Sequence, residues 1–469
     1  MKNEYPTESK RLNESQCGLS RRAFLALGIS APMIVPAHVL GRTAKRAAPS
    51  DRLNIAAVGI GGMGKNYIAG CESENIIALA DVDDKMAAPV LQRFPKAARY
   101  RDFRVMLEKE KGIDAVIVGT PDHTHAVVSM AAIQYGKHLY VAKPMTRTIH
   151  EARAVTAAAK AAGLATQMSV QSCASDASCR TVEWLQAGAV GAVREVHVWS
   201  DRPVWPQGIP RPKETHPVPD HLDWDLWLGP APQRPYHPCY HPFDFRGWHD
   251  FGTGALGDMA CHSFHAFFEL LKLEKPASVC ASLAKPRIPA LDGSADPSWS
   301  RSKPIDYSET FPVSSIVIWD YPQRGDLPPL RMYWYDGGLR PIVPGGMDIR
   351  ATLRGDGVIF VGDLGAMLTG FTGGPMALSE ERKRTFAEPE KSLPRSIGHY
   401  EEWILACRGG EPARCHFEFG SAVTEVALLG VIAQRTGEYL QWDAENMRFS
   451  NNDDANELIA PPYRAGWSL

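Results

Sequence analysis

The amino-acid sequence predicts an α/β protein with two domains: a parallel sheet covered by helices on both faces, then an α/β domain with an open, mostly antiparallel sheet. Three observations lead to this prediction. Apolar, strand-like runs alternate with helical segments over residues 51–170, and the first run ends in a glycine-rich turn. From about Gln171 strands are no longer regularly followed by helices, and all 12 tryptophans lie at Trp184 or later. The 469 residues suffice for two sizeable cores.

The alternation in residues 51–170 predicts the elements of the first domain. Strands are expected at Leu53–Val58, Ile76–Ala80, near Tyr100, Ala115–Val118, His138–Ala142 and Ala165–Ser169, and helices at Gly64–Glu72, Asp83–Phe94, Asp102–Lys109 and Ile149–Ala162. Strands that alternate with helices form a parallel sheet, and such sheets bind ligands at the carboxyl ends of their strands.

A glycine motif follows the first strand and predicts a dinucleotide site. The glycines Gly59, Gly61 and Gly64 have the spacing G-x-G-x-x-G. The first makes a tight turn, the second lets a pyrophosphate approach the backbone, and the third lets helix and strand pack closely. The anion would lie on the free N–H groups of the helix N-terminus. The predicted cofactor-binding loop comprises Gly59, Ile60, Gly61, Gly62, Met63 and Gly64.

A carboxylate at the end of the second strand favours NAD as the cofactor. Asp81 lies 22 residues beyond Gly59, where a carboxylate accepts hydrogen bonds from the adenosine ribose hydroxyls. No arginine directly follows Asp81 to neutralise a 2′-phosphate, so NAD is favoured over NADP. The alternative is that Asp81 caps the helix that starts at Asp83.

The fourth and fifth strands deliver further candidates. Thr120, Pro121 and His125 should border the cofactor; His123 and His125 could ligate a metal, but a loop or helix-cap role is favoured and no metal is expected. The fifth strand delivers Lys143, a candidate to bind the cofactor, orient a substrate hydroxyl and tune a neighbouring acid. The alternative for Lys143 is a solvated surface lysine.

The second domain combines strands with aromatic loops. Strands are expected at Arg194–Ser200, Ser278–Leu283, Ser314–Trp319, Leu330–Tyr335 and Val358–Val361. The loops Arg202–Pro219 and Gly229–Asp250 are dense in Trp, Tyr, His and Pro, a composition that suits sugar rings. Trp205, Arg246 and Trp248 are the substrate-binding candidates, although core packing explains most individual tryptophans.

One helical segment carries a carboxylate and an imidazole on one face. Asp258 and His262 are four residues apart, and this spacing brings both side chains together. A carboxylate beside an imidazole orients the ring and suits proton transfer to or from an alcohol. The alternative is an ordinary helix pair with His262 satisfied in the core.

The composition excludes several classes of partner. The formal net charge of −2 provides no basic field for nucleic acid or anionic membranes. The nine cysteines form no C-x-x-C pair, so neither a zinc knuckle nor a thioredoxin-type redox pair is indicated.

Residues 1–50 are interpreted as a signal peptide and linker. Arg21 and Arg22 form the pair of a twin-arginine export signal, followed by an apolar stretch that Pro32 and Pro36 interrupt, too short to span a membrane. Val35-Pro36-Ala37 is a plausible cleavage site; the alternative is a disordered basic tail. This route exports folded proteins, so a periplasmic enzyme would acquire its cofactor in the cytoplasm and hold it tightly.

Together these motifs resemble the glucose–fructose oxidoreductase, inositol dehydrogenase and MocA (Gfo/Idh/MocA) family, over nearly all of Leu53–Leu469. The resemblance rests on the glycine loop, Ala80-Asp81-Val82-Asp83, Gly119-Thr120-Pro121-Asp122-His123, Lys143-Pro144 and the Asp258/His262 pair, and the stretches 222–232, 250–258 and 462–467 resemble an exported branch of the family. It implies a Rossmann domain over residues 51–170 and a substrate and oligomerisation domain over 171–469. It also implies hydride transfer between NAD(P) and a hydroxyl or keto carbon of a sugar, cyclitol or glycoside, and a homodimer or homotetramer formed through the open sheet.

The resemblance assigns roles to three residues. His262 would take the hydroxyl proton, Lys143 would hydrogen-bond the reacting oxygen, and Asp258 would position the substrate or His262. The family usually has Glu before the lysine, where this chain has Ala142, which leaves a contact to the cofactor or lysine missing.

Three other functions remain open. The first is a glycosidase with resident NAD. It would oxidise a ring hydroxyl, eliminate the aglycone and reduce the ring again, and it would need a further base, which the segment His237–His249 could supply. The second is a non-catalytic sugar-binding protein on the same fold. The third and weakest is a metal-dependent hydrolase that uses His237 and His241, because Pro238 opposes a regular helix there.

Overall fold

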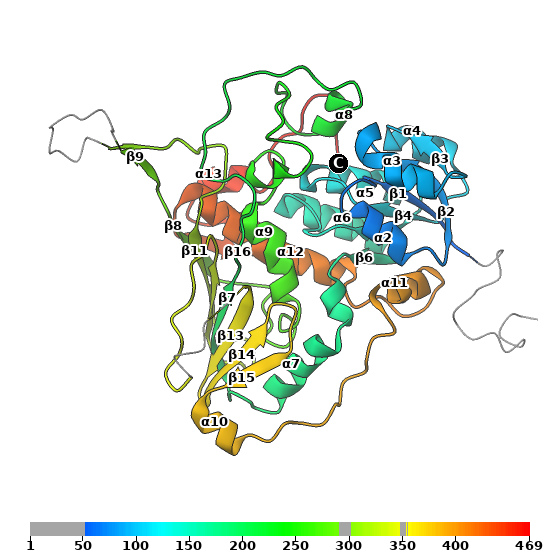
Figure 1. The fold of residues 1–469 in the computed structure, drawn as a ribbon. Helices are drawn as coiled ribbons and strands as arrows, with labels where there is room; N and C mark the ends of the chain where they lie inside the picture. The colour runs from blue at the N-terminus through cyan, green and yellow to red at the C-terminus, as the bar shows by residue number, and fades with distance from the viewer. Residues whose placement is uncertain (1–51, 290–301, 348–352, 354) are drawn as a thin grey trace, which may run out of the picture. The chain divides into compact units, whose positions relative to one another are not determined.

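The computed structural model describes residues 52–289, 302–347, 353 and 355–469 (Figure 1). The predicted signal segment, with its twin arginines and cleavage site, lies outside the described residues. Two main sheets organise the rest: one of six strands and one of nine, with a separate two-stranded ribbon of β9 (Arg287–Pro289) and β10 (Ser302–Pro304).

The six-stranded sheet is parallel in every pair and has the strand order β3-β2-β1-β4-β5-β6. Its strands are β1 (Asn54–Val58), β2 (Asn75–Ala80), β3 (Ala98–Tyr100), β4 (Ala115–Val118), β5 (His138–Val141) and β6 (Thr166–Met168). The helices are α2 (Gly64–Gly70), α3 (Asp84–Arg93), α4 (Phe103–Lys109), α5 (His125–Gln134) and α6 (Ile149–Ala161). The order places β1 between β2 and β4, so the loops after these three strands share one edge of the sheet.

Two apolar cores cover the two faces of this sheet. Residues of α2 and α3, with Trp403 and Ile404 from α11 (His399–Cys407), pack on one face. Residues of α4, α5 and α6 pack on the other. This doubly wound arrangement confirms the predicted fold class of the first domain, and the predicted strands agree with the observed ones to within one or two residues.

The nine-stranded sheet has the order β15-β14-β13-β7-β12-β11-β8-β16-β17. Its strands are β7 (Val193–Trp199), β8 (Ser278–Leu283), β11 (Ser315–Tyr321), β12 (Leu330–Tyr335), β13 (Gly357–Gly362), β14 (Gly365–Gly370), β15 (Pro375–Leu378), β16 (Leu440–Asp443) and β17 (Arg448–Phe449). Strand β7 pairs in parallel with β12, and the other described pairs are antiparallel. The predicted, mostly antiparallel sheet is therefore confirmed.

Helices lie on one face of this sheet. Besides α9 (Gly254–Phe264), α11 and α12 (Phe417–Thr436), the described chain after β6 contains α7 (Asp176–Gln186), α8 (Trp224–Leu228), α10 (Glu380–Thr385) and α13 (Asp453–Glu457). In β11, Val317 and Trp319 are buried in the core under the helices, whereas Ile316 and Ile318 are half-buried on the opposite face. The second face is thus only partly covered in the described residues.

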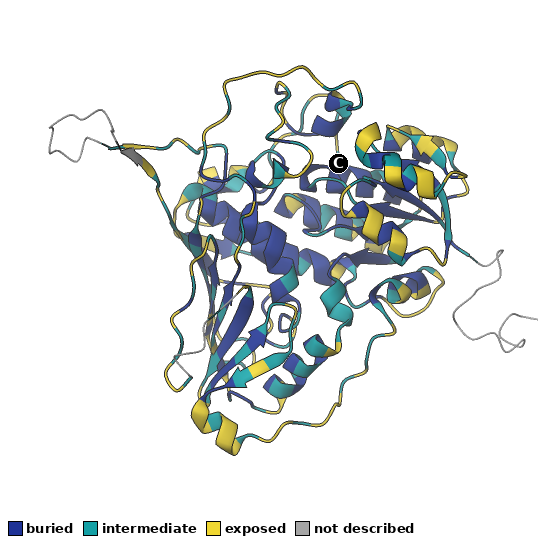
Figure 2. Ribbon diagram, viewed as in Figure 1, coloured by how far each residue is buried: buried dark blue, intermediate teal, exposed yellow. Residues whose placement is uncertain are grey.

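Helix α12 packs against both α9 and β11. Its most apolar window is long and apolar enough to cross a membrane, but 89% of that window is buried inside the fold (Figure 2). At Gly430 an added Cβ would lie 2.5 Å from the ring of Trp319 and 2.6 Å from Leu256 on α9. The absence of a side chain there lets α9 and the sheet approach α12 closely, which fixes the helix that carries Asp258 and His262.

Candidate functional site

The glycine loop between β1 and α2 has the backbone that a dinucleotide requires. Gly59 has φ +75°, and a Cβ there would lie 2.6 Å from the N atom of Thr120. A Cβ at Gly64 would lie 1.9 Å from the carbonyl oxygen of Gly59. Gly62, by contrast, is exposed and has open space around it. The loop is therefore tightly packed at Gly59 and Gly64 and open at Gly62. This arrangement fits a pyrophosphate at the start of α2.

Asp81 follows β2 and contacts this loop. Its carboxylate accepts hydrogen bonds from the N–H groups of Ile60 (2.7 Å), Gly61 (3.1 Å) and Asp83 (3.0 Å). Burial raises the pKa of Asp81, and these N–H donors oppose the rise. The cap of α3 is Asp83, which accepts from Lys85 and Met86, so the alternative interpretation of Asp81 as the helix cap is wrong.

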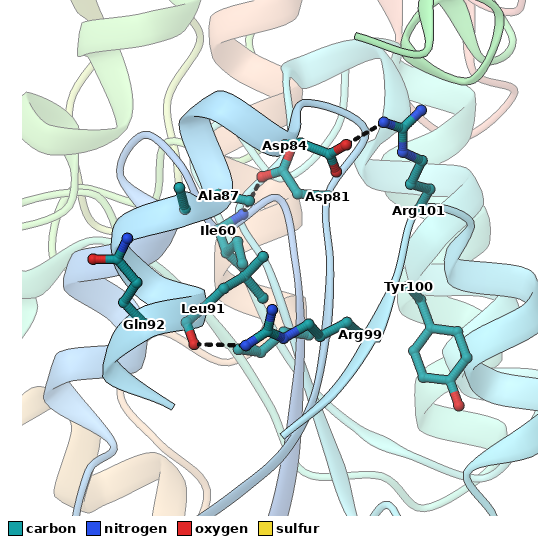
Figure 3. Close-up of a pocket in the computed structure, with 11 residues that line it drawn as sticks. Ile60, Asp81, Asp84, Ala87, Leu91, Gln92, Arg99, Tyr100 and Arg101 are labelled. Carbon is teal, nitrogen blue, oxygen red and sulfur yellow. Dashed lines mark hydrogen bonds and ion pairs between the residues drawn. The ribbon is translucent and has the colours of Figure 1, made fainter. Parts of the chain in front are cut away.

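A cavity of about 430 Å³ lies next to Asp81, between α3 and β3 (Figure 3). Its lining includes Ile60 of the glycine loop and Arg101, which forms an ion pair with Asp84 across the cavity. Arg101 is thus already paired with a carboxylate. The cavity places open volume beside the carboxylate predicted to bind the ribose.

The loop after β4 is fixed by its histidines. His125 lies 2.8 Å from the carbonyl oxygen of Thr120 and 2.9 Å from that of Pro144, and His123 lies 2.8 Å from that of Trp227. Each contact joins a ring nitrogen to a backbone carbonyl. His125 thereby ties the predicted cofactor loop, with Thr120 and Pro121, to the segment that carries Lys143.

Lys143, which follows β5, meets Asp258 on α9 although the two residues are far apart in the chain. The Lys143 ammonium lies 2.7 Å from Asp258 Oδ1 and donates to the Asp258 backbone carbonyl, also at 2.7 Å. Arg246 Nε donates to the same Oδ1 at 3.0 Å. Burial alone would raise the pKa of Asp258, but the charges of Lys143 and Arg246 lower it to about 2. The carboxylate therefore stays ionised between two cations, and the alternative of Lys143 as a solvated surface lysine is wrong.

His262 lies one turn beyond Asp258 on α9 and faces Phe371, with ring centroids 5.7 Å apart. Within the described residues its ring nitrogens have no hydrogen-bond partner. Burial first, and then the charge of Lys143, lower the pKa of His262 to about 3. The ring is thus neutral near pH 7 and has a nitrogen available to accept a proton, so the alternative of a histidine satisfied in the core does not describe it.

A chain of hydrogen bonds that the sequence did not reveal links the backbone of Lys143 to α2, the helix that follows the glycine loop. The Lys143 N–H donates to Ser169 Oγ (3.0 Å), and Ser169 donates to the hydroxyl of Tyr67 (3.1 Å) on α2. Thr253, which precedes α9, donates to the buried Asp122 after β4 (2.8 Å). These contacts fix α9 against the carboxyl edge of the parallel sheet.

The three predicted substrate residues have different environments. The Arg246 guanidinium lies over the rings of Phe245 (4.5 Å), Phe243 (4.7 Å) and Trp205 (5.7 Å). Trp205 is buried and donates to Gln207 (2.8 Å). Trp248 is fully buried and donates to the Cys239 carbonyl (3.1 Å). The structure thus places Trp248 in aromatic packing, and Arg246 with the exposed Phe243 beside Asp258.

Known proteins resemble both halves of the chain. The model of the Gfo/Idh/MocA oxidoreductase family for the NAD-binding Rossmann fold matches residues 53–170, and its C-terminal alpha/beta domain model matches residues 204–287. A levoglucosan dehydrogenase from Pseudarthrobacter phenanthrenivorans is 23% identical over 52% of this chain and 58% of its own length. The scyllo-inositol 2-dehydrogenase (NAD(+)) of Bacillus subtilis is 25% identical over 36% of this chain and 47% of its own length. The chain thus spans about half the length of these relatives.

Solved structures share the fold at low identity. The WlbA dehydrogenase from Bordetella pertussis, in complex with NADH and UDP-GlcNAcA, has a TM-score of 0.57 at 15% identity and covers 84% of this chain and 99% of its own. Levoglucosan dehydrogenase in complex with NADH has a TM-score of 0.51 at 17% identity and covers 83% and 98%.

Fold, glycine loop and sequence matches together define a protein with an NAD-binding Rossmann domain. More narrowly, two segments of the chain, residues 53–170 and 204–287, are similar to the two domains of the Gfo/Idh/MocA family.

The geometry of Gly64 yields a test of the cofactor loop. Gly64→Ala should weaken NAD binding about tenfold or more, because the new Cβ would push the start of α2 away from Gly59; tenfold corresponds to about 1.4 kcal/mol. Titration of NADH fluorescence measures the dissociation constant. Gly112→Ala is the matched control, since Gly112 has open space around it. Equal affinities in the two variants would contradict the assigned role of the loop.

Proposed function

We propose that the protein is an NAD-dependent dehydrogenase that transfers hydride between the cofactor and a hydroxyl or keto carbon of a sugar, cyclitol or glycoside. The observation that carries the proposal is the ion pair of Lys143 with Asp258 beside the neutral His262, joined through Ser169 and Tyr67 to the helix that follows the glycine loop. The similarity to levoglucosan and inositol dehydrogenases supports a polyhydroxylated substrate.

The cofactor, when bound, supplies a nicotinamide ring that accepts or donates hydride. The residues of the chain handle the proton and the orientation. Lys143 hydrogen-bonds the reacting oxygen and stabilises the negative charge that develops there. His262 accepts the hydroxyl proton during oxidation and returns it during reduction. Asp258 holds Lys143 in place, and Arg246 fixes Asp258 by binding the same carboxylate oxygen.

Three further features support the choice of NAD, the binding of the substrate and the oligomeric state. The Asp81 carboxylate favours NAD over NADP, because a 2′-phosphate would lie next to it, while nearby Arg101 is already paired with Asp84. Phe243 and Arg246 offer an apolar face and a cation to a substrate. The half-buried apolar face that includes Ile316 on β11 supports a homodimer or homotetramer formed through the open sheet.

The catalytic assignment is tested by removing each reacting group. Lys143→Ala and His262→Ala should each lower kcat by about 10²–10⁴-fold, because proton transfer by a positioned group contributes that much. The assay follows NADH absorbance with a panel of sugars, cyclitols and glycosides. Lys85→Ala and His216→Ala, at exposed positions, are the matched controls. Near-normal turnover in both site variants, with intact folding by circular dichroism, would refute the assignment.

The state of His262 predicts the pH dependence. Because its pKa lies at about 3, the ring is already a proton acceptor throughout about pH 5–8, so kcat/KM for alcohol oxidation should show no acid limb near the usual histidine pKa of about 6.5. The profile is measured in overlapping buffers at constant ionic strength. An acid limb near pH 6.5 that disappears in His262→Asn would show that the histidine titrates normally.

We also propose that the twin-arginine segment exports the protein to the periplasm, which the pairing of Arg21 and Arg22 ahead of an apolar stretch supports. The double variant Arg21→Lys, Arg22→Lys should keep the protein in the cytoplasm, because this route reads the arginine pair. Fractionation followed by immunoblotting measures the distribution. Arg11→Lys, outside the pair, is the control. Periplasmic protein in equal amounts from both would contradict the proposal.

A further inference from the structure

Residues 219–229, called the strap here, come from the second half of the chain but lie against loops of the parallel sheet. The strap consists of a turn at Pro219 and helix α8. Its first part pairs with the loop after β2: Leu222 and Asp83 form an antiparallel bridge. The Asp223 N–H donates to the Val82 carbonyl, and the Asp84 N–H donates to the His221 carbonyl, each at 2.9 Å.

Two histidines strengthen this junction by binding opposite oxygens of one carboxylate. His221 Nδ1 lies 2.9 Å from Asp83 Oδ1, and His241 Nε2 lies 2.7 Å from Asp83 Oδ2. The Asp83 side chain is only 3% exposed. Burial would raise the pKa of Asp83, but the bond from His241 and the backbone N–H of Met86 lower it. A buried, ionised Asp83 with two imidazole partners makes a stronger junction than the backbone bonds alone.

The second part of the strap reaches the loop after β4. The Trp227 carbonyl lies 2.8 Å from His123 Nε2. Gly229, with φ +52°, is so close to that loop that a Cβ would lie 2.9 Å from Thr124 Cγ2.

The C-terminal segment fixes the strap from outside. The Arg464 N–H donates to the Pro230 carbonyl (2.9 Å), its Nε donates to the Gly229 carbonyl (3.0 Å), and its guanidinium forms an ion pair with Asp225. Its neighbour Trp467 lies under Arg104 of α4, whose guanidinium is 4.7 Å from the ring centroid.

The strap therefore connects the loops after β2 and β4, the two loops that flank the glycine loop after β1 in the strand order. A dinucleotide binds at this edge of such a sheet, with its adenosine half beside the carboxylate after β2. We propose that the strap retains the adenosine half of NAD, that release of the cofactor requires the strap to detach from Asp83, and that Asp83, His221 and His241 are positioning residues for a resident cofactor. The inference rests on the proposed function.

The test measures how fast the full-length protein releases NADH, independently of turnover. Loss of two hydrogen bonds to a buried carboxylate should accelerate release about tenfold or more in the double variant His221→Phe, His241→Phe, because a phenyl ring has no N–H donor. Stopped-flow fluorescence after mixing the NADH complex with excess NAD gives the rate. The nucleotide in the supernatant of purified, denatured protein should also fall from near stoichiometric to a minor fraction. Hydride transfer in a single turnover of protein saturated with cofactor should stay unchanged.

Two variants serve as controls. His216→Phe makes the same substitution at an exposed position just before the strap, without an Asp83 contact, and should release NADH at the wild-type rate. Asp83→Asn keeps a good helix cap but removes the charge that both histidines bind, so it should accelerate release even if the histidine variant fails to fold.

The outcomes separate the two proposals. Release rates within twofold of wild type in both Asp83→Asn and the histidine variant, with normal hydride transfer, would overturn the proposal that the strap retains NAD and would leave the proposed function standing. A wild-type protein that binds no nicotinamide nucleotide would overturn the proposed function and this inference with it.

Discussion

The structure depends above all on one buried carboxylate. Asp258 sits between Lys143 of the parallel sheet and Arg246 of the aromatic loop, and its negative charge is shared between them. Removal of one member of such a buried pair costs about 3–5 kcal/mol, because the remaining charge loses its partner in a site with little water. The same contact that joins the two halves of the chain thus also orients the lysine. The stability of the fold and the geometry of the candidate site therefore cannot be altered separately at this point.

Local sequence was sufficient to predict the first sheet and its glycine loop. The reasons are steric and short-range: Gly64 must lack a side chain because Gly59 lies against it, and apolar runs such as Ala115–Val118 are buried on both faces. Helix α12 was not predicted, because it is buried on nearly all sides and shows no polar stripe from which its period could be read. Strands β15–β17 were missed because each has only two to four residues, and β14 was missed because it begins and ends with glycine.

The candidate site was predictable only in its local parts. The spacing of Asp258 and His262 placed them on one face of a helix, and the end of a strand singled out Lys143. The contacts that assemble the site join residues far apart in the chain. Lys143 meets Asp258 across 115 positions, and at the strap His241 meets Asp83 across 158. Such contacts arise from tertiary packing and cannot be predicted from a short stretch of sequence. Packing also decides the role of Trp248, which the sequence suggested as a substrate-binding residue: its neighbours bury it completely.

The shared carboxylate also constrains how this chain can diverge. Lys143, Arg246 and Asp258 occupy three separate segments, yet a neutral residue at position 258 would leave two cations facing each other in a buried space. A change at one position is tolerable only together with changes at the others. The three residues are therefore expected to change together rather than one at a time.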